Sequence, residues 1–572
     1  MRKIITLVLM LSLSVSLRAQ VLQWGKSLSN NQYSSVKDVL TDAAGNVYSV
    51  GFFSGTVDFD PGAAVFNLTS AGWYDAFVQK LDVNGNLVWA VKMGFAQDDI
   101  AEQLVMDNAG DILVVGTSDG LFNLGLGRED IAIWKLSNGG VLQWSKKIGN
   151  NYWDYGTAIS VDAANNIYVI GTFENTVDFN PGGTPQVLTS TGNLKDMYIL
   201  KLLSNGNFRW VKQIATATGN PERMQQTVYN SANNHVYLGG VFFGKTDFNP
   251  SVAAADTFFL DSGSPGIKSV FVSEMDTAGN LVHAVAIGNQ TEILFGNMVV
   301  NNAGSKLCIT GGFRSNVDFN PGAGSSFMDA GLNVGTAIYC LYLNPDLTFQ
   351  SVFQLPSQTP FTNSVGLCAK FDAADNLFLA GRLEGTVDLA PDAGTLLYTS
   401  AGSQDMFLVK INASSELEYG NGAGGVNNEV VGSLDVNIFG DIIIGGVFAG
   451  TLNFSMNGGI FQMIAGGGTG AGYIVKYAPS FPLPIHTLQF TAELMAGQEV
   501  LLSWTGNNVQ DVALYELESS QDALHWKVIC RREADQHAAA SLQYRYTDRA
   551  VQLGTTFYRL REVSREGTFS YS

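Results

Sequence analysis

One short element recurs seven times along the chain, and this recurrence limits the fold more than any other feature. A typical copy reads Asp42-AAGNVY, and the copies lie 65, 55, 69, 70, 71 and 65 residues apart. They begin at Asp42, Asp107, Asp162, Ser231, Asn301, Asp372 and Asn437. Self-similarity at such a period indicates a repeat architecture in which each repeat is one small unit of supersecondary structure.

Each repeat contains four short segments rich in β-branched and aromatic residues, which predict four antiparallel strands. The seventh repeat ends at Gly472-YIVKYAPS and lacks its fourth segment. The missing segment lies at the other end of the chain, where Val21-LQWGKSL closely matches Val141-LQWSKKI. A closed ring whose last blade is assembled from both ends explains this displacement. We therefore predict an all-β fold with a seven-bladed β-propeller over residues 21–479.

Two kinds of position within the repeat predict local structure. In the D-x-x-G-N turns, such as the one at Asp42, the Asp side chain is expected to cap its own turn, and Gly supplies the positive φ. The fourth segment carries an aromatic position that we expect to pack between neighbouring blades. At this position His283 is expected to be a core histidine. The residues at this position are Trp24, Trp89, Trp144, Trp210, His283, Phe349 and Tyr419.

A longer connection in several repeats reads V-D-F-[DN]-P-G, as at Asp58-FDPG and Asp318-FNPG. With these elements in fixed order, residues 21–479 resemble the SBBP-type β-propeller repeats of secreted bacterial proteins. The V-D-F-[DN]-P-G segment is typical of versions from Bacteroidetes. The resemblance implies an exported propeller, but this repeat family carries no single activity and no catalytic residues to transfer.

The first twenty residues predict a secretory signal peptide. Arg2 and Lys3 precede the apolar run Ile4–Leu17, and Ala19 offers a cleavage point before Val21. No other stretch reaches the roughly 18 to 20 apolar residues needed to cross a bilayer, so we expect no transmembrane segment. The mature protein is therefore expected to be secreted or displayed on the cell surface.

A second domain is predicted after a linker at residues 480–485. Residues 486–572 contain short alternating runs such as Val500-LLSW and Phe557-YRLREV, with Trp504 and Tyr558 as expected core aromatics. This pattern favours a fibronectin-III-like β-sandwich. The segment resembles the small sandwich that precedes type IX secretion sorting domains. The resemblance implies export or surface attachment by that system, although no sorting domain follows in this sequence.

Charge narrows the partner classes. The formal net charge is -19, with 32 Lys and Arg against 51 Asp and Glu. Such a chain repels phosphate backbones and anionic lipid headgroups, which argues against nucleic-acid and membrane-surface binding. A glycan, a protein or a divalent cation fits better, and we expect a monomer.

The V-D-F-[DN]-P-G connections have two interpretations. Two oxygen-bearing side chains two residues apart are suitable ligands for calcium, although the spacing is not that of an EF-hand. The alternative is an Asx turn held by Pro, and we favour this structural role. No other cofactor is predicted. The candidate calcium ligands are Asp58, Asp60, Asp178, Asn180, Asp247, Asn249, Asp318 and Asn320.

A candidate binding cluster lies in a connection between two repeats. Tyr152, Trp153, Asp154 and Tyr155 form a run of aromatic and acidic residues of the kind that stacks on sugar rings. The predicted topology places this run on the same face of the ring as the V-D-F-[DN]-P-G connections, and loops on a rigid scaffold are common recognition sites. Packing against the next blade is the structural alternative.

Enzyme signatures are weak. Gly116-TSDG matches a G-x-S-x-G nucleophile elbow, but it occupies the repeat slot of Gly51-FFSG and is expected to be a strand end. The five histidines form no H-E-x-x-H motif, and Gly466-GGTGAG lacks the Lys of a P-loop.

The four cysteines, Cys308, Cys340, Cys368 and Cys530, are interpreted as buried small side chains, with one bridge among the first three as the alternative.

These observations favour an exported, non-catalytic binding or adhesion module that presents a propeller loop face to a glycan or protein. A secreted hydrolase or lyase with carboxylates in the propeller channel is the first alternative. A structural cell-surface component is the second. An enzymatic activity is left open by the sequence, with binding preferred.

Overall fold

The computed structural model describes residues 21–478 and 490–571, apart from 29–31, 63, 120–128, 217–222, 251–255, 264–265, 289–291, 332–334, 361, 392–393, 457–460, 466–469, 496–498, 507–511, 521–526, 534–541, 550–556 and 565–568. The chain divides into two compact units, Met1–Pro479 and Ser480–Ser572. The expected signal peptide, the linker at 480–485 and most of the run Gly466-GGTGAG lie outside the described residues.

The described residues form an all-β, repeat β-propeller-like fold. Their regular structure is strands plus the 3-10 turn η1 (Thr191–Asn193). No helix in this part of the chain is long and apolar enough to span a bilayer. Strands predominate because each short run of β-branched and aromatic residues is ended by a Gly- or Asp-containing turn.

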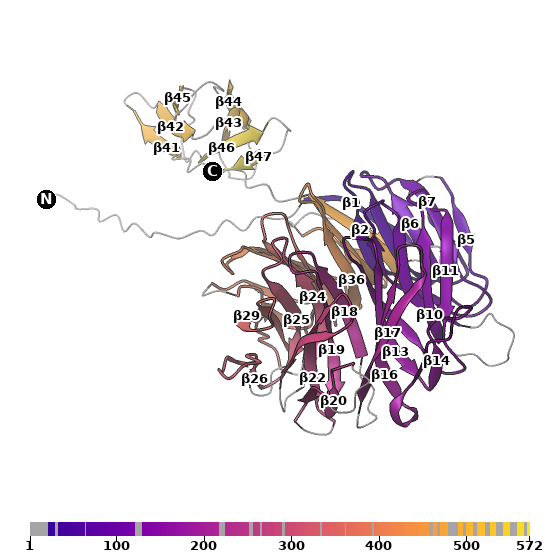
Figure 1. Ribbon diagram of the computed structural model, residues 1–572. Helices are drawn as coiled ribbons and strands as arrows, with labels where there is room; N and C mark the ends of the chain where they lie inside the picture. Colours follow the sequence, from indigo (N-terminus) through magenta and orange to yellow (C-terminus); the bar gives the residue numbers. More distant parts are fainter. Residues whose placement is uncertain are drawn as a thin grey trace. The chain divides into compact units, whose positions relative to one another are not determined.

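Antiparallel sheets of four strands follow one another through the first unit, and a hairpin of the fourth repeat extends one of them to six strands (Figure 1). The first strands of these sheets are β2 (Ser34–Thr41), β8 (Asp99–Met106), β12 (Tyr155–Val161), β18 (Arg223–Asn230), β24 (Ile293–Val300), β30 (Val365–Phe371) and β36 (Glu429–Val436). The second strands are β3 (Val47–Phe53), β9 (Ile112–Asp119), β13 (Ile167–Glu174), β19 (His235–Phe243), β25 (Leu307–Phe313), β31 (Leu377–Leu383) and β37 (Ile442–Phe448).

The third strands are β6 (Asp75–Leu81), β10 (Glu129–Leu136), β16 (Lys195–Leu202), β22 (Lys268–Asp276), β28 (Ala337–Leu343), β34 (Asp405–Ile411) and β40 (Ala471–Ala478). The fourth strands are β7 (Leu87–Met93), β11 (Leu142–Ile148), β17 (Phe208–Thr216), β23 (Leu281–Ile287), β29 (Phe349–Leu355), β35 (Leu417–Ala423) and, from the chain start, β1 (Val21–Leu28). Each first strand contacts the first strand of the next sheet, and β36 contacts β2, so the first strands form a closed circuit.

Short hairpins leave the sheets between the second and third strands. They are β4–β5 (Thr56–Asp58, Asn67–Thr69), β14–β15 (Thr176–Asp178, Val187–Thr189), β20–β21 (Lys245–Asp247, Phe259–Asp261), β26–β27 (Asn316–Asp318, Phe327–Asp329), β32–β33 (Thr386–Asp388, Leu397–Thr399) and β38–β39 (Thr451–Asn453, Gln462–Ile464). Each hairpin packs onto its own sheet through a buried side chain. Phe59, for example, lies 5.1 Å from Phe53 and 4.9 Å from Phe77 between ring centroids.

The strand at the start of the chain completes the last sheet, as the sequence predicts. β1 pairs antiparallel with β40, with Ser27 opposite Tyr473 and Trp24 opposite Lys476. This pairing joins segments more than 440 residues apart and covers an edge that β40 would otherwise expose. In Figure 1 the indigo β1 lies beside the orange strands of that sheet.

The turn and aromatic positions behave largely as predicted. Asp42 Oδ1 accepts the N–H groups of Ala44 (3.0 Å) and Asn46 (2.9 Å), and Gly45 has φ 80°. The indole of Trp24 lies against Gly85 of the next sheet, so close that a Cβ there would be 2.9 Å from it. Trp89, Trp144 and Trp210 repeat this contact on Gly140, Gly206 and Gly279.

Every first strand carries a β-bulge near its start, and the bulge explains a recurring glycine. In β12 the register shifts between Gly156 and Ala158. The carbonyl of Tyr155 then projects at Gly171 of β13, where a Cβ would lie 1.8 Å from the oxygen. The other sheets show the same approach of 1.9 to 2.2 Å at Gly51, Gly116, Gly240, Gly311, Gly381 and Gly446.

The second unit contains two sheets around its own small core. One sheet has the order β41 (Phe490–Leu494), β42 (Val500–Gly506), β45 (Leu542–Asp548). The other has the order β44 (Lys527–Glu533), β43 (Val512–Ser520), β46 (Phe557–Ser564), β47 (Phe569–Tyr571). Trp504 is buried and stacks on Tyr544 with centroids 5.4 Å apart, whereas Tyr558 is only partly buried.

The bulge contact gives a test of the repeat geometry. Gly171→Ala forces a methyl group into the Tyr155 carbonyl and is expected to lower the free energy of unfolding by about 3 kcal/mol. Gly139→Ala is the matched control, because the nearest atom to its added Cβ is 3.8 Å away. Urea denaturation of both variants measures the difference, and equal stability would contradict the bulge explanation.

Candidate functional site

The antiparallel sheets give the first unit two distinct faces. The turns after the first and third strands lie at one end of the strands, and we call this end the turn face. The hairpins and the connections between sheets lie at the other end, which we call the loop face. Recognition residues on loops are positioned by the rigid sheets beneath them.

The cluster at Tyr152–Tyr155 lies on the loop face, between β11 and β12. Tyr152 is 45% exposed and Trp153 is 37% exposed, while Tyr155 is half-buried at the start of β12. Asp154 is fully buried and points away from solvent. The aromatic residues Tyr152 and Trp153 of the predicted cluster are therefore at the surface, whereas the carboxylate of Asp154 is buried.

Asp154 is a structural cap. Its carboxylate accepts the N–H groups of Asn150 and Glu174, each at 2.9 Å. Burial raises the pKa of Asp154 to about 8, and these hydrogen bonds oppose the rise only in part. The run of aromatic and acidic residues in the sequence did not reveal this inward orientation, because the N–H groups that hold the carboxylate belong to Asn150 and to the distant Glu174.

A lysine that the sequence analysis missed completes the aromatic cluster. Lys195 Nζ lies 4.4 Å from the Tyr155 ring centroid and 5.2 Å from that of Trp153. Partial burial lowers the pKa of Lys195. A cation over two aromatic faces holds both rings in place. Lys195 begins β16, 40 positions after Tyr155, so no local motif signals the contact.

Two further aromatic side chains are exposed on the loop face. Trp73, just before β6, is 79% exposed, and Phe95, just after β7, is 54% exposed. Their segments touch, since a Cβ at Gly72 would lie 2.2 Å from the Gln97 carbonyl oxygen. A large aromatic side chain in a Gly- and Ser-rich connection is the sequence signal that would have found Trp73.

The side-chain oxygens of most candidate calcium residues accept hydrogen bonds from backbone N–H groups of their own loops. Asp318 Oδ1 accepts the N–H groups of Asn320 (3.0 Å) and Ser326 (2.8 Å). Asp58, Asp178 and Asp247 make the same two bonds, to residues two positions on and at the far side of the loop. Asp60 and Asn320 cap Gly62 and Gly322. The geometry is that of the Asx-turn interpretation, and Asn453 repeats it in the last sheet.

Within the described part of the chain, no group of three or more His, Cys, Asp or Glu side chains is arranged to hold a metal ion. Asn180 and Asn249 lie in loops of the same kind, with backbone N–H groups bonded to Asp178 and Asp247. A calcium role for these loops stays a hypothesis, and its test is given below.

The bulged first strands place a belt of polar side chains around the inside of the circuit. Asp38 accepts the Ser433 hydroxyl and the Leu104 N–H, so it links three neighbouring sheets. Burial raises the pKa of Asp38 to about 6. Asp435 is held by Lys370 at 2.8 Å and by the Thr41 N–H. Asp38 and Asp435 therefore join neighbouring sheets.

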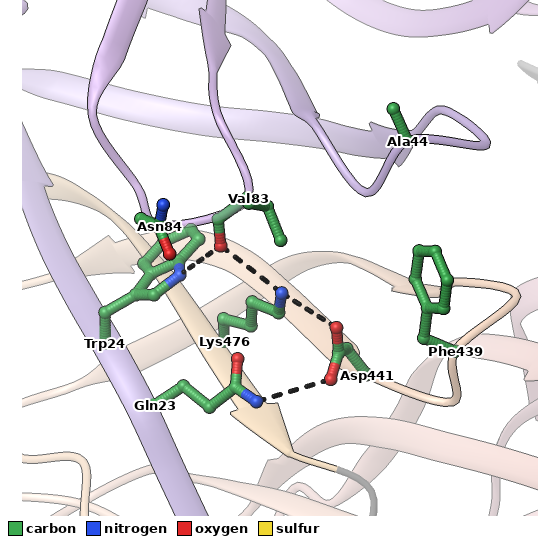
Figure 2. A pocket seen from close by; sticks show the side chains of 8 residues that line it. All are labelled: Gln23, Trp24, Ala44, Val83, Asn84, Phe439, Asp441 and Lys476. Carbon is green, nitrogen blue, oxygen red and sulfur yellow. Dashed lines mark hydrogen bonds and ion pairs between the residues drawn. The ribbon is translucent and has the colours of Figure 1, made fainter.

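A pocket of about 670 Å³ opens on the turn face, where the last sheet meets the first (Figure 2). Trp24 and Phe439 line it together with the ion pair of Lys476 and Asp441 at 2.7 Å. Trp24 Nε1 and Lys476 Nζ both donate to the Val83 carbonyl, at 3.1 and 3.3 Å. Lys476 therefore joins the two sheets, while Asp441 pairs with it inside the last sheet.

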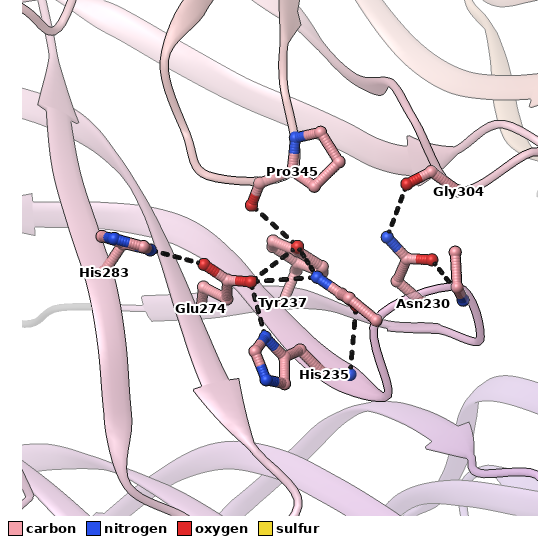
Figure 3. Close-up of polar contacts among 9 residues, drawn as sticks. Asn230, His235, Tyr237, Glu274, His283, Gly304 and Pro345 are labelled. Carbon is pink, nitrogen blue, oxygen red and sulfur yellow. Dashed lines mark hydrogen bonds and ion pairs between the residues drawn. The ribbon is translucent and has the colours of Figure 1, made fainter.

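The turn face also carries a histidine pair around one buried glutamate (Figure 3). Glu274 is 3% exposed, and its oxygens lie 2.6 Å from His235 Nδ1 and 2.7 Å from His283 Nδ1. The Tyr237 hydroxyl lies 2.9 Å from Glu274 and 2.8 Å from the Pro345 carbonyl. The expectation of a core histidine is wrong for His283, whose side chain is 51% exposed, because Glu274 holds the ring at the edge of the sheet.

The remaining sequence motifs are structural. Gly116 and Ser118 lie within β9, so the G-x-S-x-G match is a strand and not an elbow. The four cysteines are free thiols. Cys308, Cys340 and Cys368 are buried, in line with small core side chains, and Cys530 is half-buried.

Comparisons with known proteins support the repeat character of the chain. No protein-family profile matches it. An alignment of 223 residues, covering 33% of this chain, is 22% identical to an uncharacterized WD repeat-containing protein of Acanthamoeba polyphaga mimivirus. The alignment covers only 16% of that protein's length. WD repeats form β-propeller blades, so the match agrees with a repeat β-propeller-like fold.

Three solved structures show weak similarity. A protein of unknown function from Bacteroides caccae has a TM-score of 0.30 and 9% identity, over 60% of this chain and 89% of that one. The acylaminoacyl peptidase of Pyrococcus horikoshii has a TM-score of 0.38 and 9% identity, over 83% and 57%. A puromycin hydrolase has a TM-score of 0.35 and 10% identity, over 83% and 58%. At these scores the similarities carry no argument about activity.

The hairpin loops give a test that separates capping from calcium binding. Asp318→Ala removes the acceptor of two N–H groups and is expected to lower the free energy of unfolding by about 1–2 kcal/mol. Asp318→Asn keeps an acceptor oxygen, as Asn453 does naturally, and is expected to be nearly neutral. Thermal unfolding with calcium and with a chelator is the measurement. Capping predicts the same melting temperature in both buffers, whereas a calcium-dependent shift that Asp318→Asn reduces would establish a metal site in this loop.

Proposed function

We propose that residues 21–479 form a closed seven-bladed β-propeller of the SBBP type, whose last blade is completed by β1. The four-stranded sheets, the closed circuit of first strands and the β1–β40 pairing support this proposal. We propose that residues 486–572 form a fibronectin-III-like β-sandwich, supported by the three- and four-stranded sheets of the second unit. We also propose that residues 480–485 form the linker between the two domains. The resemblance of the second domain to the sandwich that precedes type IX secretion sorting domains supports export or surface attachment by that system.

The protein's proposed function is that of an exported, non-catalytic binding module that takes a glycan on its loop face. One observation carries this proposal. Trp73, Phe95, Tyr152 and Trp153 are exposed on the loop face, and they come from connections of consecutive sheets. Flat aromatic faces stack on the apolar faces of sugar rings, and exposed aromatic groups on rigid scaffolds mark interaction sites.

Charge and location agree with this choice. A net charge of -19 disfavours nucleic acids and anionic surfaces but leaves a neutral glycan unaffected. The N-terminal sequence supports export to the cell exterior, where glycans are abundant. A monomer is proposed, with the aromatic side chains of one propeller forming one site. A protein ligand, a hydrolase or lyase activity and a structural surface role are the alternatives.

Binding to a glycan array by the full chain tests the function directly. Trp73→Ala and Trp153→Ala each remove a stacking face and are expected to weaken binding of the array hit by about tenfold or more. Phe439→Ala is the matched control, because Phe439 is 54% exposed on the turn face and is expected to leave affinity unchanged.

Isothermal titration with the best array hit measures these affinities. No binding to any array glycan would contradict the glycan proposal, and equal losses in the Phe439→Ala control would contradict the assignment to the loop face. Hydrolysis of the bound glycan during the titration would instead favour the enzyme alternative.

A further inference from the structure

On the loop face, each of three joints between neighbouring sheets contains a pair of carboxyl groups that no sequence motif indicates. One member begins a third strand, and the other stands at the start of the following first strand. The first members are Asp75, Asp130 and Asp405, and their partners are Asp99, Asp154 and Glu429. The two carboxylates of each pair repel one another. The first member of each pair contributes to raising the pKa of the second member, which is Asp99, Asp154 or Glu429.

In two of the three joints a lysine forms an ion pair with the first carboxyl group. Lys92 on β7 lies 3.0 Å from Asp75, and Lys147 on β11 lies 2.9 Å from Asp130. Both lysines occupy the same position, two residues before the glycine that opens the connection. Two buried carboxylates with an ammonium group carry a net charge of only one, which lowers the cost of burial.

The third joint replaces the lysine with a tyrosine. Gly422 stands at the lysine position of β35, and the ring of Tyr398 fills the space, so that a Cβ at Gly422 would lie 2.4 Å from it. The Tyr398 hydroxyl lies 3.1 Å from Asp405 Oδ2. Tyr398 therefore takes the place of an ammonium group without supplying its charge.

Asp405 and Glu429 are both fully buried. Their other contacts are N–H groups, from Ala401 to Asp405 at 2.9 Å and from Gly425 to Glu429 at 3.2 Å. Within the part of the chain that the structure describes, Asp405 Oδ1 and Glu429 Oε1 have no hydrogen-bond partner. Among the described residues, no Lys, Arg or His makes an ion pair with either carboxyl group.

We propose that Asp405 and Glu429 hold one proton between them at neutral pH, and that this proton fastens the connection Gly424–Asn428 to the loop face. A proton fits because it needs no cavity, whereas Tyr398 occupies the place where the other joints hold a cation. Loss of the proton leaves two buried negative charges and favours opening of the connection. The other titratable groups of the described chain that face the pair are the tyrosines Tyr398 and Tyr473.

The direction of the pH effect follows from burial. Burial, and then Asp405, raise the pKa of Glu429 from 4.5 to about 8. The folded chain therefore holds a proton that the unfolded chain releases between these values. Its contribution to stability is fully present below pH 4.5, is lost as the pH rises, and is absent above about pH 8.

The test compares the full chain with Glu429→Gln, which keeps the shape and removes the titration. The measured quantity is the equilibrium constant of unfolding of the wild type divided by that of the variant. This ratio is expected to increase with pH between pH 5.5 and 7.5, by at most about tenfold per pH unit. Asp99→Asn is the control from a joint with a lysine. Since the pKa of Asp99 is about 6, its ratio is expected to be flat between pH 6.5 and 7.5.

A flat ratio for Glu429→Gln would overturn the proposal, and so would calcium restoring wild-type stability at pH 9, because a cation would then be the occupant. Asp405→Asn repeats the test if Glu429→Gln does not fold. Hydrogen exchange of the wild-type chain is independent of any variant. The Gly424–Asn428 amides should gain exchange above pH 8 relative to the equivalent Gly94–Asp98 amides, and equal behaviour would contradict the proposal.

Discussion

The pairing of β1 with β40 is the interaction on which the first unit depends. Each sheet buries one face against the sheet before it and the other against the sheet after it, and β1 is the outermost strand of the last sheet. The hydrogen bonds from Val21–Ala478 to Leu28–Gly472 complete this sheet, and Trp24 then reaches the turn of the first sheet at Val83. Because the two strands are at opposite ends of the unit, this pairing is a contact of very high sequence separation, which costs loop-closure entropy.

The packing between sheets uses the same devices repeatedly, with local changes in charge. Bulged first strands press a carbonyl against a glycine, hairpin aromatics cover each sheet, and a third-strand lysine meets a turn carboxylate in several sheets. Where the lysine is replaced by Glu274, two histidines take the opposite role. Where Lys92 and Lys147 have no counterpart, Tyr398 stands beside an acid pair without a cation. Departures from a repeat are thus the places where this propeller-like unit acquires particular chemistry.

Much of the fold was predictable because it follows from local periodicity. The caps at Asp42 and its equivalents, the glycine turns and the closing strand were all visible as residues in fixed order. The candidate site was predictable only in part. Tyr152 and Trp153 are exposed as expected, but Asp154 is buried and Lys195 arrives from a distant strand. His283 was misjudged because its position was read from its repeat, whereas its conformation is decided by Glu274 opposite it.

The sequence by itself determined the all-β class, the repeat and the location of the missing strand, since these depend on spacing and alternation along the chain. The tertiary structure alone decided which side chains distant in the sequence meet, such as Lys195 with Trp153 and Asp38 with Ser433. The physical reason is that burial and charge compensation are properties of neighbours in space. Residues with the same place in the repeat therefore have different environments when the strand beside them carries a different charge.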